Sequence, residues 1–97
     1  MTATTAAIKF ENNQFYVSGV LCFDSVGDLN KQSRSLFLQA SNIHLDLAAV
    51  VSADSAAVAI LLEWMRFAKA AGKDFKLDNI PPQILEIAAM SGVEDFL

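Results

Sequence analysis

One segment of this chain limits its possible folds more than any other, and it reads DLAAVVSADSAAVAILL from Asp46 to Leu62. Its first part is typical of a buried strand, and its last part is typical of a helix that is apolar on more than one side. Asp54 stands between the two parts, where a carboxylate can accept hydrogen bonds from the first N–H groups of a helix. The segment therefore predicts a strand, a loop and a helix that begins at Ser55.

A β-hairpin is predicted upstream of this segment. Two β-prone runs, 7–10 and 14–20, flank Asn12-Asn13, and asparagine tolerates the positive φ angles of a tight hairpin turn. Gly19 lies inside the second run, and an isolated glycine there marks a bulge or a close approach of another backbone.

Helix signals occur at three places after the hairpin. Asp24-Ser25 is an N-cap pair, Gly72 ends the central helix, and Pro81-Pro82 suits the first turn of the last helix. Short strands are predicted at 43–47 and 75–77, and residues 48–51 either extend the first of them or form the loop into the central helix. The predicted helices begin near Val26, cover 55–71 and cover 83–90, and residues 93–97 form a tail.

The predicted order of elements is β-β-α-β-α-β-α. A chain of 97 residues has no room for a second core, so we expect one domain spanning residues 1–97. Strands that alternate with helices favour an α/β fold, here with a mixed, mostly parallel sheet after the N-terminal hairpin.

Composition excludes two classes of protein and favours a third. The chain is 54% hydrophobic and 19% charged, which excludes intrinsic disorder. The longest apolar run, Ala56–Leu62, is far shorter than the roughly 20 residues that span a membrane. The N-terminus lacks the pattern of a signal peptide, and one cysteine, Cys22, fits a reducing compartment. We therefore expect a cytoplasmic protein with apolar surface left for a partner.

Charge argues against two kinds of partner. The net charge is −4, and the seven lysines and arginines are scattered along the chain. A chain without a basic patch is not expected to bind nucleic acid. It also lacks the polybasic segment that would attach it directly to an anionic membrane.

The helix after Asp54 carries two apolar stripes when its residues are placed at about 100° each around the axis. The first stripe contains Val58, Leu61, Leu62 and Met65, and the second contains Ile60, Trp64, Phe67 and Ala71. A helix on a sheet needs one such stripe. The second stripe either packs on a neighbouring helix or faces a partner, and we expect Trp64 at or near a protein interface because tryptophan is enriched at binding hot spots.

Ser55 follows the predicted cap at the first helical position. The simplest interpretation is that its hydroxyl helps to cap the helix. A phosphate on this hydroxyl would be tolerated by the helix dipole, yet it would disrupt an apolar contact made by a partner. The position is therefore also suited to a phosphorylation switch.

Other chemistry has little support in the residues. His44 stands alone on an apolar strand and is interpreted as a sheet residue. The sequence shows no cluster of histidine, cysteine or carboxylate residues at metal-ligand spacing and no glycine-rich phosphate loop. We expect no catalytic residues, no metal, no cofactor and no enzyme activity.

A family resemblance rests on the same central segment. Asp46 is followed eight residues later by Asp54-Ser55, then by small residues and an apolar helix, and this pattern resembles the STAS domain. Further similarities extend over nearly the whole chain, at Ala70-Ala71-Gly72-Lys73, Leu77-Asp78-Asn79-Ile80-Pro81, Ile84-Leu85-Glu86-Ile87-Ala88 and Gly92-Val93. The resemblance implies a STAS fold.

Two branches of that family are relevant. In anti-sigma-factor antagonists a partner kinase phosphorylates the serine that matches Ser55, but the Ser/Thr-Gly pair that follows it there is Ala56-Ala57 here. The chain looks more like the MlaB type, the small cytoplasmic STAS subunit of an ABC complex that moves phospholipid in the Gram-negative envelope. In that type the Asp-Ser/Thr loop and its helix contact the ATPase subunit and support its activity.

The resemblance therefore implies a non-catalytic accessory subunit of a phospholipid-transport ABC transporter, which maintains outer-membrane lipid asymmetry. It would be peripheral to the inner membrane through a complex with the ATPase and the permease. The alternative is an anti-sigma-factor antagonist regulated by phosphorylation of Ser55. The residues expected to bind the partner are Asp54, Ser55, Ala56, Ala57, Ile60, Trp64 and Phe67.

Overall fold

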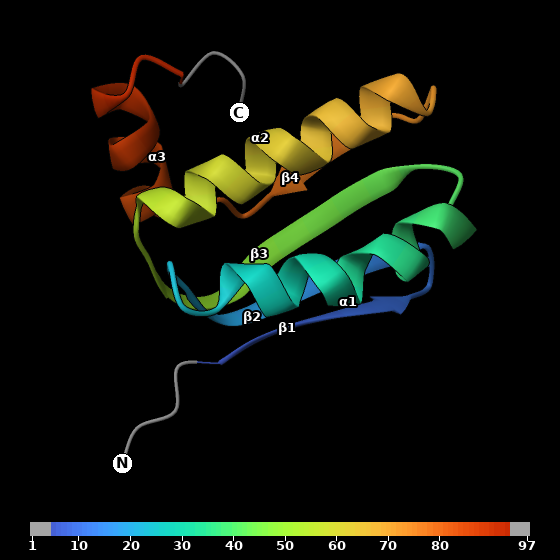
Figure 1. Ribbon diagram of the computed structural model, residues 1–97, viewed down its shortest axis with the longest axis horizontal. Coiled ribbons are helices and arrows are strands. Elements are labelled where there is room, and N and C mark those ends of the chain that lie inside the picture. The colour runs from blue at the N-terminus through green and yellow to red at the C-terminus, as the bar shows by residue number, and fades with distance from the viewer. Residues whose placement is uncertain (1–4, 94–97) are drawn as a thin grey trace.

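The computed structural model describes residues 5–93, and Figure 1 shows its helices and strands in the predicted order. The four strands form one mixed sheet in the order β1-β2-β3-β4, with β1 antiparallel to β2 and the other pairs parallel. The α/β prediction is confirmed. The elements are β1 (Ala6–Glu11), β2 (Gln14–Leu21), α1 (Val26–Gln39), β3 (Ile43–Ala53), α2 (Ser55–Ala70), β4 (Phe75–Asp78) and α3 (Pro82–Met90).

The hairpin forms because its turn and its glycine adopt backbone angles that few residues tolerate. Asn12 and Asn13 have φ angles of 53° and 62°, as a tight turn between antiparallel strands requires. Gly19 has a φ angle of 93°, and a Cβ atom there would overlap the carbonyl oxygen of Thr5. The register between β2 and β3 also shifts after Gly19, so both interpretations of this glycine are confirmed.

The central strand β3 is longer than the predicted core of 43–47. It continues to Ala53, so residues 48–51 extend the strand and do not form a loop. Two register shifts against β2 allow this extension, because a bulge accommodates an extra residue without ending the pairing. The long strand carries the chain directly to Asp54, so the start of α2 lies at the edge of the sheet.

The helices cover one face of the sheet. In Figure 1, α1 and α2 lie side by side on this face, and α3 packs beside α2. Alternate strand residues such as Phe15, Val17 and Leu45 point toward the helices and are fully buried. The intervening positions, such as Lys9 and Lys76, are exposed on the opposite face.

Helix α2 packs against α1, α3 and the sheet. Its most deeply buried line contains Ala57, Leu61, Trp64 and Ala68, which are each at most 2% exposed. This line takes members from both predicted stripes and follows the i, i+4, i+7 spacing of a helix seated on a sheet. Helix α2 is therefore buried over a wide arc, because it has the sheet below it and a helix on either side.

Candidate functional site

Asp54 joins two loops at one end of the molecule. Its Oδ1 atom accepts a hydrogen bond of 2.8 Å from the Ala56 N–H, which confirms the predicted cap of α2. Its Oδ2 atom accepts a hydrogen bond of 3.2 Å from the N–H of Phe23, in the loop between β2 and α1. One exposed carboxylate therefore holds the start of α2 against the loop that leads into α1.

The loop before α1 is held from inside by Ser25. This residue is the N-cap of α1, as predicted, but its side chain does not cap the helix. Its buried hydroxyl instead donates to the Val20 carbonyl at 2.6 Å and accepts from the Cys22 N–H at 3.0 Å. These bonds fix the backbone of the loop while the residue at its tip, Phe23, points away from the core.

Phe23 is 84% exposed, although phenylalanine is a residue that proteins usually bury. Phe23 was not among the residues predicted to bind a partner. A usable signal was present, because Phe23 directly precedes the Asp24-Ser25 cap and belongs to neither the strand nor the helix periodicity that would bury it. Exposed aromatic side chains on a fixed loop are favourable anchors for a protein partner.

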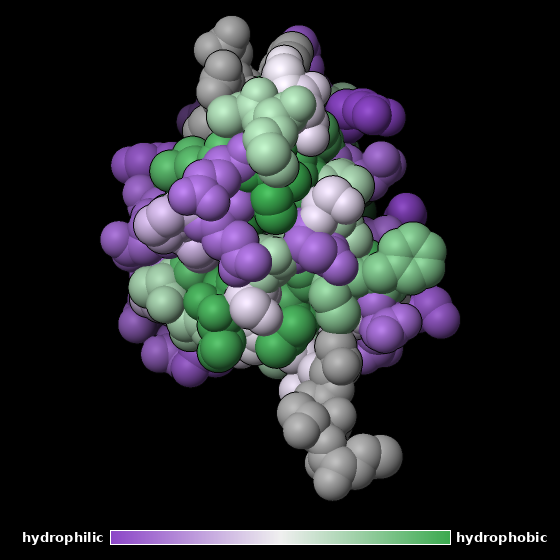
Figure 2. Space-filling model, turned by 90° about the vertical axis from the view of Figure 1, so that its left-hand side faces the viewer, coloured by the Kyte–Doolittle hydropathy of each residue, from purple (hydrophilic) through white to green (hydrophobic). Residues whose placement is uncertain are grey.

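A groove of about 600 Å³ opens beside Phe23, between the first turns of α1 and α2. The lining is mostly apolar, and its polar groups include the Glu63 carboxylate and the Ser55 hydroxyl. Figure 2 views this end of the molecule and shows apolar patches among polar side chains. A mostly apolar lining with few polar groups suits the side chains of a protein partner. The groove is lined by Phe23, Val26, Gly27, Asn30, Ser55, Ala56, Ala59, Ile60 and Glu63.

The structure places the predicted partner-binding residues at different depths. Ser55 is exposed and Ala56 is half-buried, and both line the groove, whereas Asp54 is exposed outside its lining. Ile60 is 6% exposed and forms part of the groove lining. Ala57 is fully buried beneath the first turn of α2, so its side chain supports the site and is not available to a partner.

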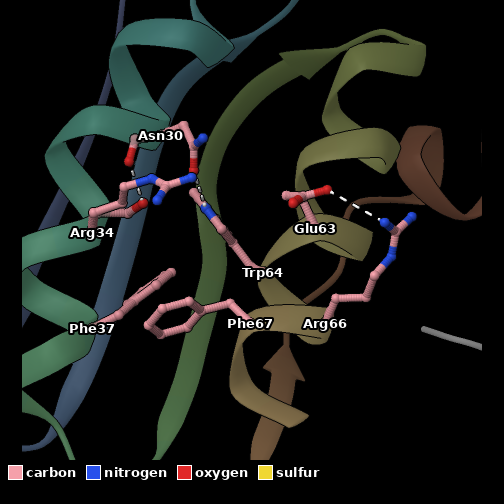
Figure 3. Close-up of a pocket in the computed structure, with 8 residues that line it drawn as sticks. Asn30, Arg34, Phe37, Glu63, Trp64, Arg66 and Phe67 are labelled. Atoms are coloured by element: carbon pink, nitrogen blue, oxygen red, sulfur yellow. Dashed lines mark hydrogen bonds and ion pairs between the residues drawn. The ribbon is translucent and has the colours of Figure 1, made fainter. Parts of the chain in front are cut away.

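Trp64 is the main correction to the predicted site. Its side chain is 2% exposed, and its ring packs edge-to-face on Phe37 of α1 at a centroid distance of 5.3 Å. Its Nε1 donates to Oδ1 of Asn30 at 3.1 Å, as Figure 3 shows. Phe67, which is half-buried, also packs on Phe37 at 6.0 Å. Of the two alternatives for the second stripe, the neighbouring helix is the one observed.

A narrower cleft of about 240 Å³ continues along the same seam between α1 and α2. Figure 3 shows Trp64 and Phe67 extending into the space between the helices, with Arg34 on the α1 side. Glu63 and Arg66 form an ion pair at its rim, with 3.7 Å between Oε2 and Nη1. Both side chains are exposed, so the pair contributes only tenths of a kcal/mol.

The described residues show neither a metal cluster nor a membrane span. Within residues 5–93, no three histidine, cysteine, aspartate or glutamate side chains are grouped to hold a metal ion. Within the same residues, no helix combines the length and the apolarity needed to cross a membrane.

Comparison with known proteins identifies the family. The family model described as "Mlab, STAS domain" matches residues 4–97, which is nearly the whole chain. A search of curated proteins finds no match. The match agrees with the β-β-α-β-α-β-α order and the mixed sheet, and it supports a STAS-type accessory or regulatory role. The chain belongs to the STAS domain family, in its MlaB type.

Proposed function

We propose that this protein is a non-catalytic accessory subunit of a phospholipid-transport ABC transporter, and that it binds and supports the cytoplasmic ATPase subunit. Family membership over residues 4–97 supports the proposal. In this assignment the protein is held at the cytoplasmic side of the inner membrane by its complex with the ATPase and the permease. It contributes to the maintenance of outer-membrane lipid asymmetry through the ATPase.

The observation that carries the proposal is the groove beside Ser55, with an exposed Phe23 fixed at its rim. The backbone N–H of Phe23 is tied to the start of α2 through the Asp54 carboxylate, so the backbone that carries the aromatic ring is held beside Ser55. A surface held in place before binding loses little conformational entropy when a partner docks. The partner would contact Phe23, Val26, Ser55, Ala56, Ala59 and Ile60 in the groove.

The test is co-purification of this protein with the ATPase subunit of a phospholipid-transport ABC transporter. We expect a stable complex that Ser55→Arg abolishes, because a long charged side chain would fill the apolar groove. Phe23→Ala should weaken the complex by at least about 2 kcal/mol, or roughly 30-fold, as the loss of a hot-spot aromatic does. Circular dichroism of both variants would verify that they remain folded.

Leu38→Ala is the matched control. Leu38 is also a large apolar residue with a highly exposed side chain, 71%, but it lies near the end of α1 remote from the groove. Its replacement should leave binding unchanged. Full affinity in Ser55→Arg and Phe23→Ala would show that the ATPase does not use this groove, and the absence of any complex would reject the proposal.

A second function has one observation in its favour. Ser55 is exposed at the first position of α2, where a kinase can reach its hydroxyl and where the helix dipole tolerates a phosphate. This geometry is compatible with an anti-sigma-factor antagonist switched by phosphorylation, although Ala56-Ala57 replaces the pair expected in that branch. Intact mass after incubation with a cognate kinase decides the matter, since that function requires one added phosphate that Ser55→Ala loses.

A further inference from the structure

The two segments that form the groove are acidic, and Glu63 is the acidic residue in the groove lining itself. These segments, 22–30 and 54–63, contain four acidic residues, Asp24, Asp28, Asp54 and Glu63, and no lysine, arginine or histidine. The chain has eleven acidic and seven basic residues in total, so the remaining seven acidic residues are balanced by seven basic ones. The whole net charge of −4 therefore equals the charge of these two segments.

Arg34 and Arg66 line the cleft that continues from the groove, but among residues 5–93 neither forms a buried ion pair with these carboxylates. All four carboxylates belong to exposed residues. Among residues 5–93, Glu63 is the one of these four acidic residues that forms an ion pair, and its partner is Arg66. The Glu63 side chain is 56% exposed and the Arg66 side chain is 77% exposed. Such a pair is screened by water and remains open to exchange with a partner's cation. Asp24 and Asp28 form no ion pair among these residues.

From this charge and the apolar lining we infer that the groove receives a cationic segment of the partner protein. Its apolar side chains would pack against Phe23, Val26 and Ile60, and its lysine or arginine side chains would face the surrounding carboxylates. The inference rests on the proposed function, because it describes the surface that the partner presents to this same groove. Complementary charge of this kind raises the association rate and excludes wrong partners.

The same charge argues against two other occupants. A second copy of this chain would bring four further carboxylates toward the four already present, and like charges across an interface are repulsive. An anionic membrane surface would repel this end of the molecule for the same reason. A cationic protein segment is the occupant for which both the apolar lining and the carboxylates are favourable.

The first test uses model peptides and needs no knowledge of the natural partner. One helical peptide has leucine on one face and lysine on the other, and its match has glutamate in place of lysine. We expect the lysine peptide to shift the NMR amide signals of Phe23, Ala56 and Ile60, with an affinity that falls as salt is added. The glutamate peptide should leave them unchanged. Equal shifts with both peptides, or none with either, would overturn the inference.

A pair of charge variants sharpens this test. Asp24→Asn with Asp28→Asn removes two charges beside the groove, and Glu11→Gln with Asp74→Asn removes two at the opposite end of the sheet. At low salt, the affinity of the first double variant for the lysine peptide should be at least about threefold lower than that of the unaltered protein. Its association rate with the ATPase should also be at least about threefold lower. The second should behave as the unaltered protein does.

The outcomes separate this inference from the proposed function. If the ATPase fails to bind but the lysine peptide occupies the groove, the proposed partner is wrong and the cationic specificity stands. If the ATPase binds through Phe23 but both double variants associate at the same rate, the proposed function stands and the cationic specificity is overturned.

Discussion

Asp54 shows how a single carboxylate can organise a binding surface. It is the natural cap of α2 through the Ala56 N–H, and it also accepts from Phe23 in a separate loop. Because both hydrogen bonds come from backbone N–H groups, the two loops are joined without any dependence on a flexible side-chain partner. The residue that the sequence indicates as a helix cap therefore also determines where Phe23 lies.

We predict that Asp54→Ala lowers the free energy of unfolding by about 1–2 kcal/mol, the usual cost of losing an N-cap. It should also weaken partner binding, because Phe23 loses its anchor. Asp54→Asn retains one acceptor oxygen and should lose less stability. Urea unfolding followed by circular dichroism measures both values, and equal stability of Asp54→Ala and the unaltered protein would contradict the assigned cap.

Trp64 is a second single residue on which the groove depends, but its side chain is buried. Its indole fills the space between α2 and α1, with Phe37 in edge-to-face contact and Asn30 accepting from its Nε1. Removing it would leave a large cavity lined by aromatic and aliphatic groups. Its role is to hold the two helices that form the groove at a fixed separation.

Trp64→Ala should therefore lower the free energy of unfolding by about 3–5 kcal/mol, as the truncation of a buried tryptophan does. Trp64→Phe, which retains much of the ring volume, should cost less. Circular dichroism is the suitable probe, since Trp64 is the single tryptophan. A loss below about 1 kcal/mol would place the side chain at the surface, where exposed substitutions typically have effects of that size.

At the scale of elements, two glycines differ in whether their strand or helix requires a glycine at that position. Gly19 in β2 has a positive φ angle and no room for a Cβ atom, because the Thr5 carbonyl lies against it. Gly27 in α1 has ordinary helical surroundings, and a Cβ atom there would meet nothing within 4 Å. The first glycine is required by the strand's bulge, and the second only weakens its helix.

Replacement of each glycine by alanine should change stability in opposite directions. Gly19→Ala should lower the free energy of unfolding by about 1–3 kcal/mol, the cost of a strained backbone position. Gly27→Ala should raise it by about 0.5–1 kcal/mol, because alanine is the better helix former. Chemical denaturation of the two variants compares them directly, and a change of the same sign in both would refute this distinction.

At the scale of the whole molecule, topology brings the functional residues together. Strands β2 and β3 are parallel neighbours, so their carboxyl ends lie at the same edge of the sheet. The chain leaves these ends through the Phe23 loop into α1 and through Asp54 into α2. Parallel α/β sheets commonly bind their partners at this edge, and here the two connections form both walls of the groove.

We expect the molecule to unfold as one cooperative unit. Trp64 reports packing between α1 and α2, whereas far-ultraviolet circular dichroism reports all the helices and strands. In a two-state domain of this size the two probes give coincident urea transitions. A fluorescence transition at lower urea than the circular dichroism transition would show that the two helices separate before the sheet unfolds.

Local sequence patterns are sufficient to predict the element order, the hairpin turn at Asn12-Asn13, the role of Asp54 as a helix cap and the α/β class. These features depend on local backbone angles, hydrogen bonds near in sequence and hydrophobic periodicity, which a sequence displays directly. It also indicated that α2 buries more than one side. It did not show which neighbour covers each side, since that depends on helices distant in the chain.

Which aromatic side chains are exposed depends on how the helices and loops pack together. Trp64 and Phe23 are both large aromatic residues near helix α2, yet α1 covers the first and leaves the second in solvent. Periodicity could not separate them, because burial is set by the packing of α1 on α2 and by the Asp54 bond to a loop 31 positions away in sequence. Trp64, which was predicted to contact a partner, is therefore a core residue. Phe23, the exposed aromatic residue at the groove, could be recognised only from the tertiary structure.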